Sequence, residues 1–333
     1  MNVFYFLMLD KIAAARLTFQ QLKIVSPETG DRFFEAYGPG NVLNFVERPY
    51  ERFNDYEQLL NIIYSDDPIK YRKLHKGTPF FFLGWAAFDM QNYTKAVYYL
   101  DNAISEDIRS FPDKWEGTEG TNALKLFINE HSPIYRVIKN LREVLEEEIT
   151  RFNSDTNNTL TIDDFVKHFV SNLLKIKKNK SSRSIVTALY TFIFEFQDRY
   201  KEVKLRSGSG GSIEPILTHL FKGGLIFESL LKQHYPTNDN GKPTRILSDI
   251  FSTSNFKNDF LQSVNQSSYL LKDIMKGIKT NDLQTAFDTT AQLRNTTGHN
   301  LVWDDIFDKS NNYKKLYDQI INAVFFVITK KYS

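Results

Sequence analysis

Apolar residues recur at helical spacing along most of the chain, whereas signals for β-strands are scarce. The clearest case follows Pro133, where apolar residues mark one side of a helix as far as position 149: Ile134, Ile138, Leu141, Leu145 and Ile149. A helix with one such stripe needs a second element to cover it. We therefore expect an all-α protein in which helices pack on helices.

Residues 80–104 predict a pair of helices that approach closely. Gly84 and Ala96 lack bulk where the two helices would meet, and Tyr93 falls at the turn between them. The segment resembles one tetratricopeptide repeat, whose signature positions hold Leu83, Gly84, Ala96, Leu100 and Ala103. It departs from the repeat at Ala87 and Ile108, and a single hairpin within a larger bundle is the alternative. The resemblance implies a surface for protein recognition.

A Gly/Ser run at residues 207–212 interrupts the helical pattern. It lacks the Gly-Lys-Ser/Thr sequence of a phosphate-binding loop and follows no predicted strand, so we interpret it as a flexible linker. The linker divides the chain into two expected domains. Residues 1–206 form a helical sensing or regulatory domain, and residues 213–333 form a second helical bundle.

In the second bundle a long helix opens at Pro215, and Gly223-Gly224 within it would let a neighbouring backbone approach. Phe325 and Phe326 give the closing helix apolar surface on a second side. The other predicted elements are short helices near residues 246–251, 259–264 and 269–278, and the closing helix over residues 313–331.

The stretch Arg294-Asn295-Thr296-Thr297-Gly298-His299-Asn300 ends the predicted helix over residues 281–294. Asn281 is the expected N-cap of that helix, with Gln284 completing a capping box. Arg294 lies seven residues after Phe287, about 20° away around an ideal helix, so it leaves the last turn toward other protein. Gly298 can end the helix in a left-handed turn, and His299 follows directly. A guanidinium and an imidazole are thus brought to one place.

This arrangement resembles the Arg-x4–6-His motif of the HEPN family, in which the residue after the arginine is polar, as Asn295 is here. The resemblance covers the C-terminal third and implies a nuclease domain with Arg294 and His299 as catalytic residues. It also implies two copies that join their motifs in one cleft, 2′,3′-cyclic phosphate products, and a role as a toxin or antiviral defence effector. The alternative is a helical interaction protein whose HEPN-like domain only dimerises or binds a ligand.

The two side chains suit RNA cleavage without a metal ion. Neutral His299 can remove the 2′-hydroxyl proton, and Arg294 can stabilise charge on the phosphoryl oxygens. Asn295 and Asn300 would contact the substrate or orient these groups. The alternative is that their side chains only form hydrogen bonds in the turn and the helix cap. RNA is the expected partner, together with a second copy of the chain and a protein regulator at the N-terminal region. The formal net charge of +2 gives no global attraction to nucleic acid. The basic run at residues 175–183 could grip phosphates, although it is also typical of a solvated helix end.

No cofactor or metal site is predicted. The chain has no cysteine, and the remaining histidines lack ligand spacing, which suggests surface or packed roles. Residues 153–161 suggest a calcium loop, but Leu160 stands at the required glycine, and Thr161 is instead a helix cap. Asp67 is a second predicted cap. The absence of disulfides fits a cytoplasmic location, and no apolar run approaches the roughly 20 residues that span a bilayer, so no membrane partner is expected.

Overall fold

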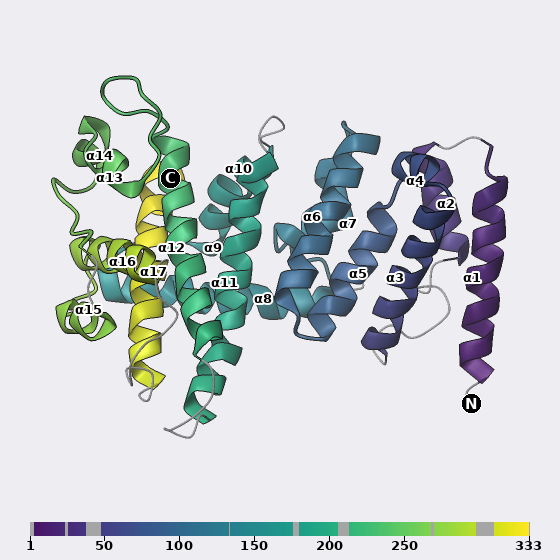
Figure 1. Cartoon of the computed structure of the whole chain (residues 1–333), viewed down its shortest axis with the longest axis horizontal. Coiled ribbons are helices and arrows are strands. Elements are labelled where there is room, and N and C mark those ends of the chain that lie inside the picture. Colours follow the sequence, from purple (N-terminus) through teal and green to yellow (C-terminus); the bar gives the residue numbers. More distant parts are fainter. Residues whose placement is uncertain are drawn as a thin grey trace. The chain divides into compact units, whose positions relative to one another are not determined.

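The computed structural model describes residues 3–23, 26–37, 48–132, 134–175, 180–205, 213–267, 270–297 and 310–332. Its elements are helices, and the only pairing of β type in these ranges is an isolated bridge between Thr237 and Pro243 (Figure 1). The predicted all-α class is therefore confirmed. Two compact units divide the chain, an N-terminal unit of Met1–Leu141 and a C-terminal unit of Arg142–Ser333.

The N-terminal unit begins with helices that follow one another along the chain. Asp67 caps the fourth of them as predicted, because its side chain accepts hydrogen bonds from the backbone of Ile69 and Lys70. The elements are α1 (Val3–Gln21), α2 (Pro27–Tyr37), α3 (Pro49–Asp66), α4 (Pro68–Lys73), α5 (Gly77–Asp89), α6 (Tyr93–Ser110), η3 (Trp115–Gly117) and α7 (Glu119–Leu124).

Helices α5 and α6 form the predicted hairpin. A Cβ atom at Gly84 would lie 3.1 Å from the Ala96 carbonyl oxygen and from Leu100, so the missing side chain is what allows this approach. At the turn the Tyr93 ring packs on Phe88, with centroids 6.3 Å apart. The close-packed hairpin is confirmed, whereas its resemblance to a tetratricopeptide repeat stays a prediction.

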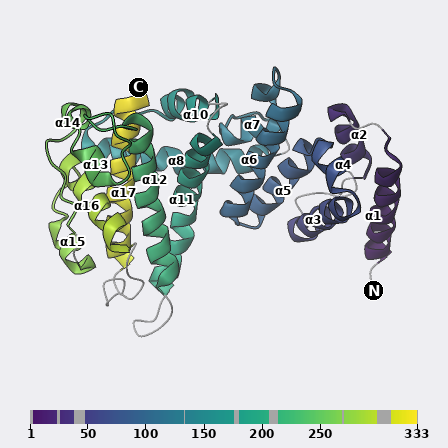
Figure 2. The same cartoon turned by 45° about the horizontal axis from the view of Figure 1, so that its top comes forward.

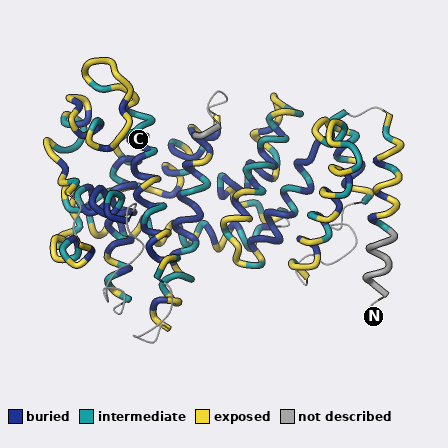
Figure 3. Tube along the Cα trace, in the orientation of Figure 1, coloured by how far each residue is buried: buried dark blue, intermediate teal, exposed yellow. Residues whose placement is uncertain are grey.

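The C-terminal unit is built around α12 (Glu214–His234) and α17 (Ser310–Tyr332), which lie side by side in both views (Figures 1 and 2). Helix α16 (Leu283–Thr297) packs on both of them and is buried along most of its length (Figure 3). The unit also contains most of α8 (Tyr135–Thr156), α9 (Ile162–Asp164), η4 (Phe165–Val170), α10 (Ser171–Lys175), α11 (Lys180–Leu205), α13 (Leu247–Phe251), α14 (Ser254–Asp259) and α15 (Leu271–Gly277).

The sequence suggested a domain boundary at residues 207–212, but the two compact units divide between Leu141 and Arg142. Helix α11 contacts α12 and α17 directly, and the Phe196 ring stacks on Tyr317 with centroids 3.7 Å apart. Phe192 of the same helix stacks on His219 at 4.4 Å. These buried aromatic contacts place residues 142–205 in the C-terminal unit. A Gly/Ser run interrupts the helical pattern of the sequence, but the segments before and after it can still share one hydrophobic core. Residues 206–212 themselves lie outside the described part.

Two local predictions in this unit are corrected. Residues 259–264 are not a helix, because α14 ends at Asp259 after starting at its cap Thr253, whose hydroxyl accepts from the Phe256 amide. The second apolar side of α17 is not available to a partner copy, since Phe325 packs on Phe152 and Phe165 within the unit at 5.4 and 6.1 Å. Thr161 caps α9 as expected, accepting a 3.0 Å hydrogen bond from the Asp164 amide.

Candidate functional site

Helix α16 carries the predicted motif, but it begins one residue later than the proposed capping box requires. Asp282 accepts a 2.8 Å hydrogen bond from the Thr285 amide and so acts as the cap. The Asn281 side chain accepts instead from Gln319 of α17, and Gln284 donates to the Ser263 carbonyl. The predicted Asn281–Gln284 capping box is therefore wrong, because both side chains are bound to neighbouring segments.

Arg294 lies in the last turn of α16, which continues three residues beyond it to Thr297. Its backbone and Cβ pack directly on α12. A Cβ atom at Gly224 would come 2.7 Å from the Arg294 Cβ and 3.1 Å from its Cα. The two helices can approach this closely only because position 224 has no side chain, which confirms the role predicted for this glycine.

The guanidinium of Arg294 is held by a buried carboxylate. Arg294 Nε donates a 2.6 Å hydrogen bond to Glu228 Oε2, and Lys232 Nζ lies 2.6 Å from Glu228 Oε1. Only 5% of the Glu228 side chain is exposed, against 27% for Arg294 and 36% for Lys232. One carboxylate is thus shared by two cations that reach solvent, and the local charge is positive.

Sequence reasoning missed Glu228, although a signal was present. It is the single acidic residue in the run Gly224-Leu-Ile-Phe-Glu228-Ser-Leu-Leu-Lys232. A carboxylate in a buried apolar run needs a cationic partner, since an unpaired buried charge is strongly unfavourable. Lys232, four residues later on the same helix, could be read from spacing. Arg294 could not, because it lies 66 positions away.

Asn295 also has a defined place. Its side-chain nitrogen donates a 2.9 Å hydrogen bond to the Gln266 carbonyl, and its oxygen accepts from Arg294 Nη1 at 3.4 Å. The amide therefore joins the loop before α15 to the guanidinium. His299 and Asn300, the other two predicted site residues, lie outside the described residues, as do Gly298 and residues 301–309.

The described histidines outside the motif have packed or surface positions, as predicted. His219 is 3% exposed, with one ring nitrogen 2.8 Å from the Phe192 carbonyl oxygen and the other 2.8 Å from the Tyr313 hydroxyl. Burial lowers the pKa of His219 to about 3, so its ring is neutral at pH 7. In the described ranges no three His, Asp or Glu side chains are grouped so that they could hold a metal ion.

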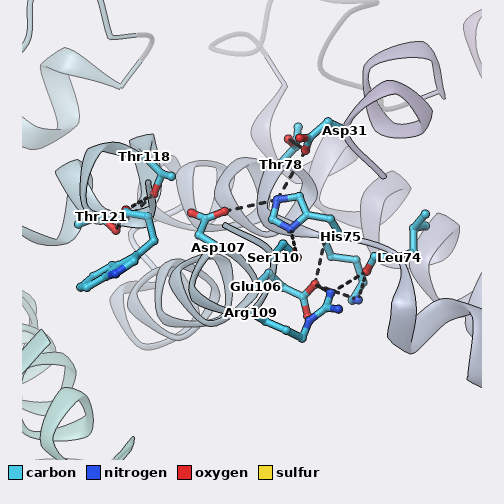
Figure 4. A network of polar contacts seen from close by, with 12 residues as sticks. Asp31, Leu74, His75, Thr78, Glu106, Asp107, Arg109, Ser110, Thr118 and Thr121 are labelled. Carbon is cyan, nitrogen blue, oxygen red and sulfur yellow. Dashed lines mark hydrogen bonds and ion pairs between the residues drawn. The ribbon is translucent and has the colours of Figure 1, made fainter. Parts of the chain in front are cut away.

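His75 is the centre of a polar network in the N-terminal unit that spacing alone did not indicate (Figure 4). Its Nδ1 lies 3.1 Å from the Ser110 hydroxyl, and its Nε2 lies 3.4 Å from Asp107 and 3.5 Å from Asp31. These groups come from α2, α6 and the turn before α5, so only the fold brings them together. Because the His75 side chain is 3% exposed and Phe111 covers its ring, the network is a structural link between helices.

The described helices include none that is long and apolar enough to cross a bilayer. Comparison of the chain with protein-family models, with curated proteins and with solved structures finds no match. The residues of the motif and their surroundings therefore carry the functional argument.

Proposed function

We propose that the C-terminal unit is an endoribonuclease that uses Arg294 and His299 and needs no metal ion. The observation that carries the proposal is the fixed guanidinium of Arg294, which Glu228 and Asn295 hold at the end of α16 while part of it remains exposed. His299 follows five residues later in the chain. A cation that is already in position needs no reorganisation when negative charge develops on the phosphoryl oxygens, and such electrostatic stabilisation is usually the largest single contribution to catalysis.

The proposed reaction is transesterification within single-stranded RNA. His299 removes the proton of a 2′-hydroxyl, the resulting oxygen attacks the adjacent phosphorus, and the bond to the 5′-oxygen breaks. Arg294 stabilises the phosphoryl oxygens through its planar fork. The products are a 2′,3′-cyclic phosphate and a 5′-hydroxyl, once the leaving oxygen has been protonated.

A homodimer follows from the number of proton-transfer groups. One His299 can act as base, but the leaving oxygen also needs an acid, and a two-fold pair of motifs provides a second imidazole. The apolar side of α17 contributes nothing to this argument, because it is covered within the unit. Sedimentation at micromolar concentration should give about twice the 38.9 kDa chain mass, and a monomer that cuts RNA would exclude the shared cleft.

The N-terminal unit binds a protein regulator through helical hairpins such as α5–α6, and the nuclease acts in the cytoplasm as a toxin or antiviral effector.

A second candidate, a helical interaction protein without activity, is favoured by one observation. Both Arg294 and Asn295 already have intramolecular partners, which suits a structural role.

Digestion of a labelled single-stranded RNA in EDTA separates the two candidates. Wild type should release fragments with cyclic phosphate ends, whereas Arg294→Ala and His299→Ala should not. Arg245→Ala and His131→Ala are matched controls at exposed positions and should cut normally. Cleavage by the motif variants at equal helicity, or cleavage that requires magnesium, would contradict the proposed reaction. A dimer that never cuts RNA would support the second candidate.

A further inference from the structure

The C-terminal unit contains a pocket of about 790 Å³ that the motif does not use. Residues of α11 and α12 form its walls, with contributions from α10 and from Tyr332 at the end of α17. A volume in this range is typical of sites for small organic molecules. The pocket therefore offers room for a ligand far smaller than RNA or a folded protein.

The charge of the lining is one-sided. Fifteen described residues line the pocket, and among them Lys222 and Lys232 are cationic while none is Asp or Glu. His234 also borders it, and burial together with the charge of Lys331 lowers the pKa of this imidazole. The neutral ring supplies hydrogen-bonding nitrogen without adding charge. Each lysine also pairs with a carboxylate outside the lining, Glu195 for Lys222 and Glu228 for Lys232, so the lining favours an anionic ligand over a cationic one without being strongly positive.

The two lysines lie far apart on the wall that α12 forms. They are ten residues apart on α12, which is about 15 Å along a helix axis. Between them the wall is mainly apolar, since α12 contributes Ile226 and Leu225, which is 39% exposed, together with Ser229. Ile185 and Ala188 of α11 extend this apolar wall. A ligand that fills the space needs an apolar body as well as a charged group.

The end at Lys232 is the more polar one. Gln233 donates a 3.0 Å hydrogen bond to Ser182 and accepts one from the Tyr332 hydroxyl at 3.2 Å. This bonded set joins the ends of α11, α12 and α17, and Lys232 precedes Gln233 in the same wall of the pocket. An anionic head at this end would meet one cation and several hydroxyl or amide groups held in place beforehand.

We propose that this pocket binds a small organic anion that has an apolar body and one phosphate or carboxylate head, with the head at Lys232. Nucleoside monophosphates and fatty acids share this chemistry. Lys222, whose nearest carboxylate Glu195 is 3.8 Å away, closes the far end and accommodates a second polar group.

The proposed ligand site is linked to Arg294 by one side chain. Lys232 and Arg294 share Glu228, each at 2.6 Å. A ligand head that pairs with Lys232 weakens its hold on Glu228, so that the carboxylate binds Arg294 more strongly. This step rests on the proposed function, and it makes the ligand an inhibitor of RNA cleavage.

Binding can be measured on the full chain without RNA. The fluorescent probe 8-anilinonaphthalene-1-sulfonate combines an apolar body with an anionic head, and N-phenyl-1-naphthylamine is its neutral counterpart. We expect one saturable sulfonate site and at least about tenfold weaker binding of the neutral probe, the size of one charge-assisted contact. Equal binding of the two probes would overturn the proposal.

Variants locate the site. Lys232→Gln should weaken sulfonate binding about tenfold, and Ser229→Phe, which fills the pocket from α12, should abolish it. Lys242→Gln is the matched control on an exposed loop and should bind as wild type does. Unchanged binding in Ser229→Phe would overturn the proposal even if Lys232→Gln fails to fold.

Displacement identifies the source of the ligand. Loss of the probe signal on adding adenosine monophosphate supports a nucleoside phosphate, and loss on adding decanoate supports a fatty acid. If neither compound displaces the probe, the proposal is contradicted. Because Arg294→Ala should still bind the probe, an inactive nuclease with an intact site counts only against the proposed function. A bound ligand that leaves RNA cleavage unchanged counts only against the link through Glu228.

Discussion

Gly224 and Arg294 face each other across the contact between α12 and α16, so closely that a Cβ atom at position 224 would lie 2.7 Å from the Arg294 Cβ. One turn later on α12, Glu228 accepts the hydrogen bond from the same arginine. The glycine sets the distance between the helices, and the carboxylate sets the direction of the guanidinium. The position of Arg294 is therefore built into the core of the unit.

Gly224→Ala should destabilise the C-terminal unit by about 1–3 kcal/mol, because the added methyl group meets backbone and Cβ atoms that cannot rotate away. Urea unfolding followed by circular dichroism measures the loss. Gly277→Ala is the matched control, since a Cβ atom there meets nothing within 4 Å. Equal midpoints for the two variants would show that the helices can separate without cost.

Glu228→Gln should leave Arg294 and Lys232 close together without their shared anion. We expect a loss of about 2 kcal/mol in the free energy of unfolding, less than the 3–5 kcal/mol typical of fully buried pairs, because both cations reach solvent. Glu202→Gln is the matched control, as its ion pair with Arg199 is exposed and should contribute less than about 0.5 kcal/mol. If the urea midpoints of the two variants agree, the stabilising role of Glu228 is contradicted.

Local sequence signals predicted the helical class, the α5–α6 hairpin and the caps Asp67 and Thr161, because each depends on residues a few positions apart. The close helix contact at Gly224 could also be predicted, since a glycine inside a helix usually has a packing reason. The prediction of a cap at Asn281 failed because Gln319, distant in sequence, binds its side chain.

Long-range pairing explains the remaining differences. The Gly/Ser run suggested a domain boundary, yet Phe196 and Tyr317 stack across it. In the same way, the carboxylate that holds Arg294 comes from another helix, and the His75 network joins three segments. A single sequence contains the chemistry of each group but not the identity of its partner.

Acidification should destabilise the C-terminal unit through His219. Its pKa is about 3 in the folded protein and near 6.5 when unfolded, so below pH 6.5 the unfolded state binds the extra proton. The contribution of neutral His219 to the free energy of unfolding is fully present above pH 6.5. It is lost as the pH falls, by about 2 kcal/mol at pH 5. Urea midpoints at pH 7 and pH 5 should differ less in His219→Gln than in wild type. An equal difference in both would show that other groups cause the pH dependence.

Arg294→Lys separates the structural use of Arg294 from the catalytic one. Lysine keeps the charge that pairs with Glu228 but lacks the planar fork that binds two phosphoryl oxygens at once. We therefore expect a urea midpoint close to that of wild type and a single-turnover RNA cleavage rate in EDTA at least about 100-fold lower. Arg245→Lys at an exposed position is the matched control and should change neither quantity. Wild-type cleavage by Arg294→Lys would show that charge alone is sufficient, whereas parallel loss of stability and cleavage would assign Arg294 to the core.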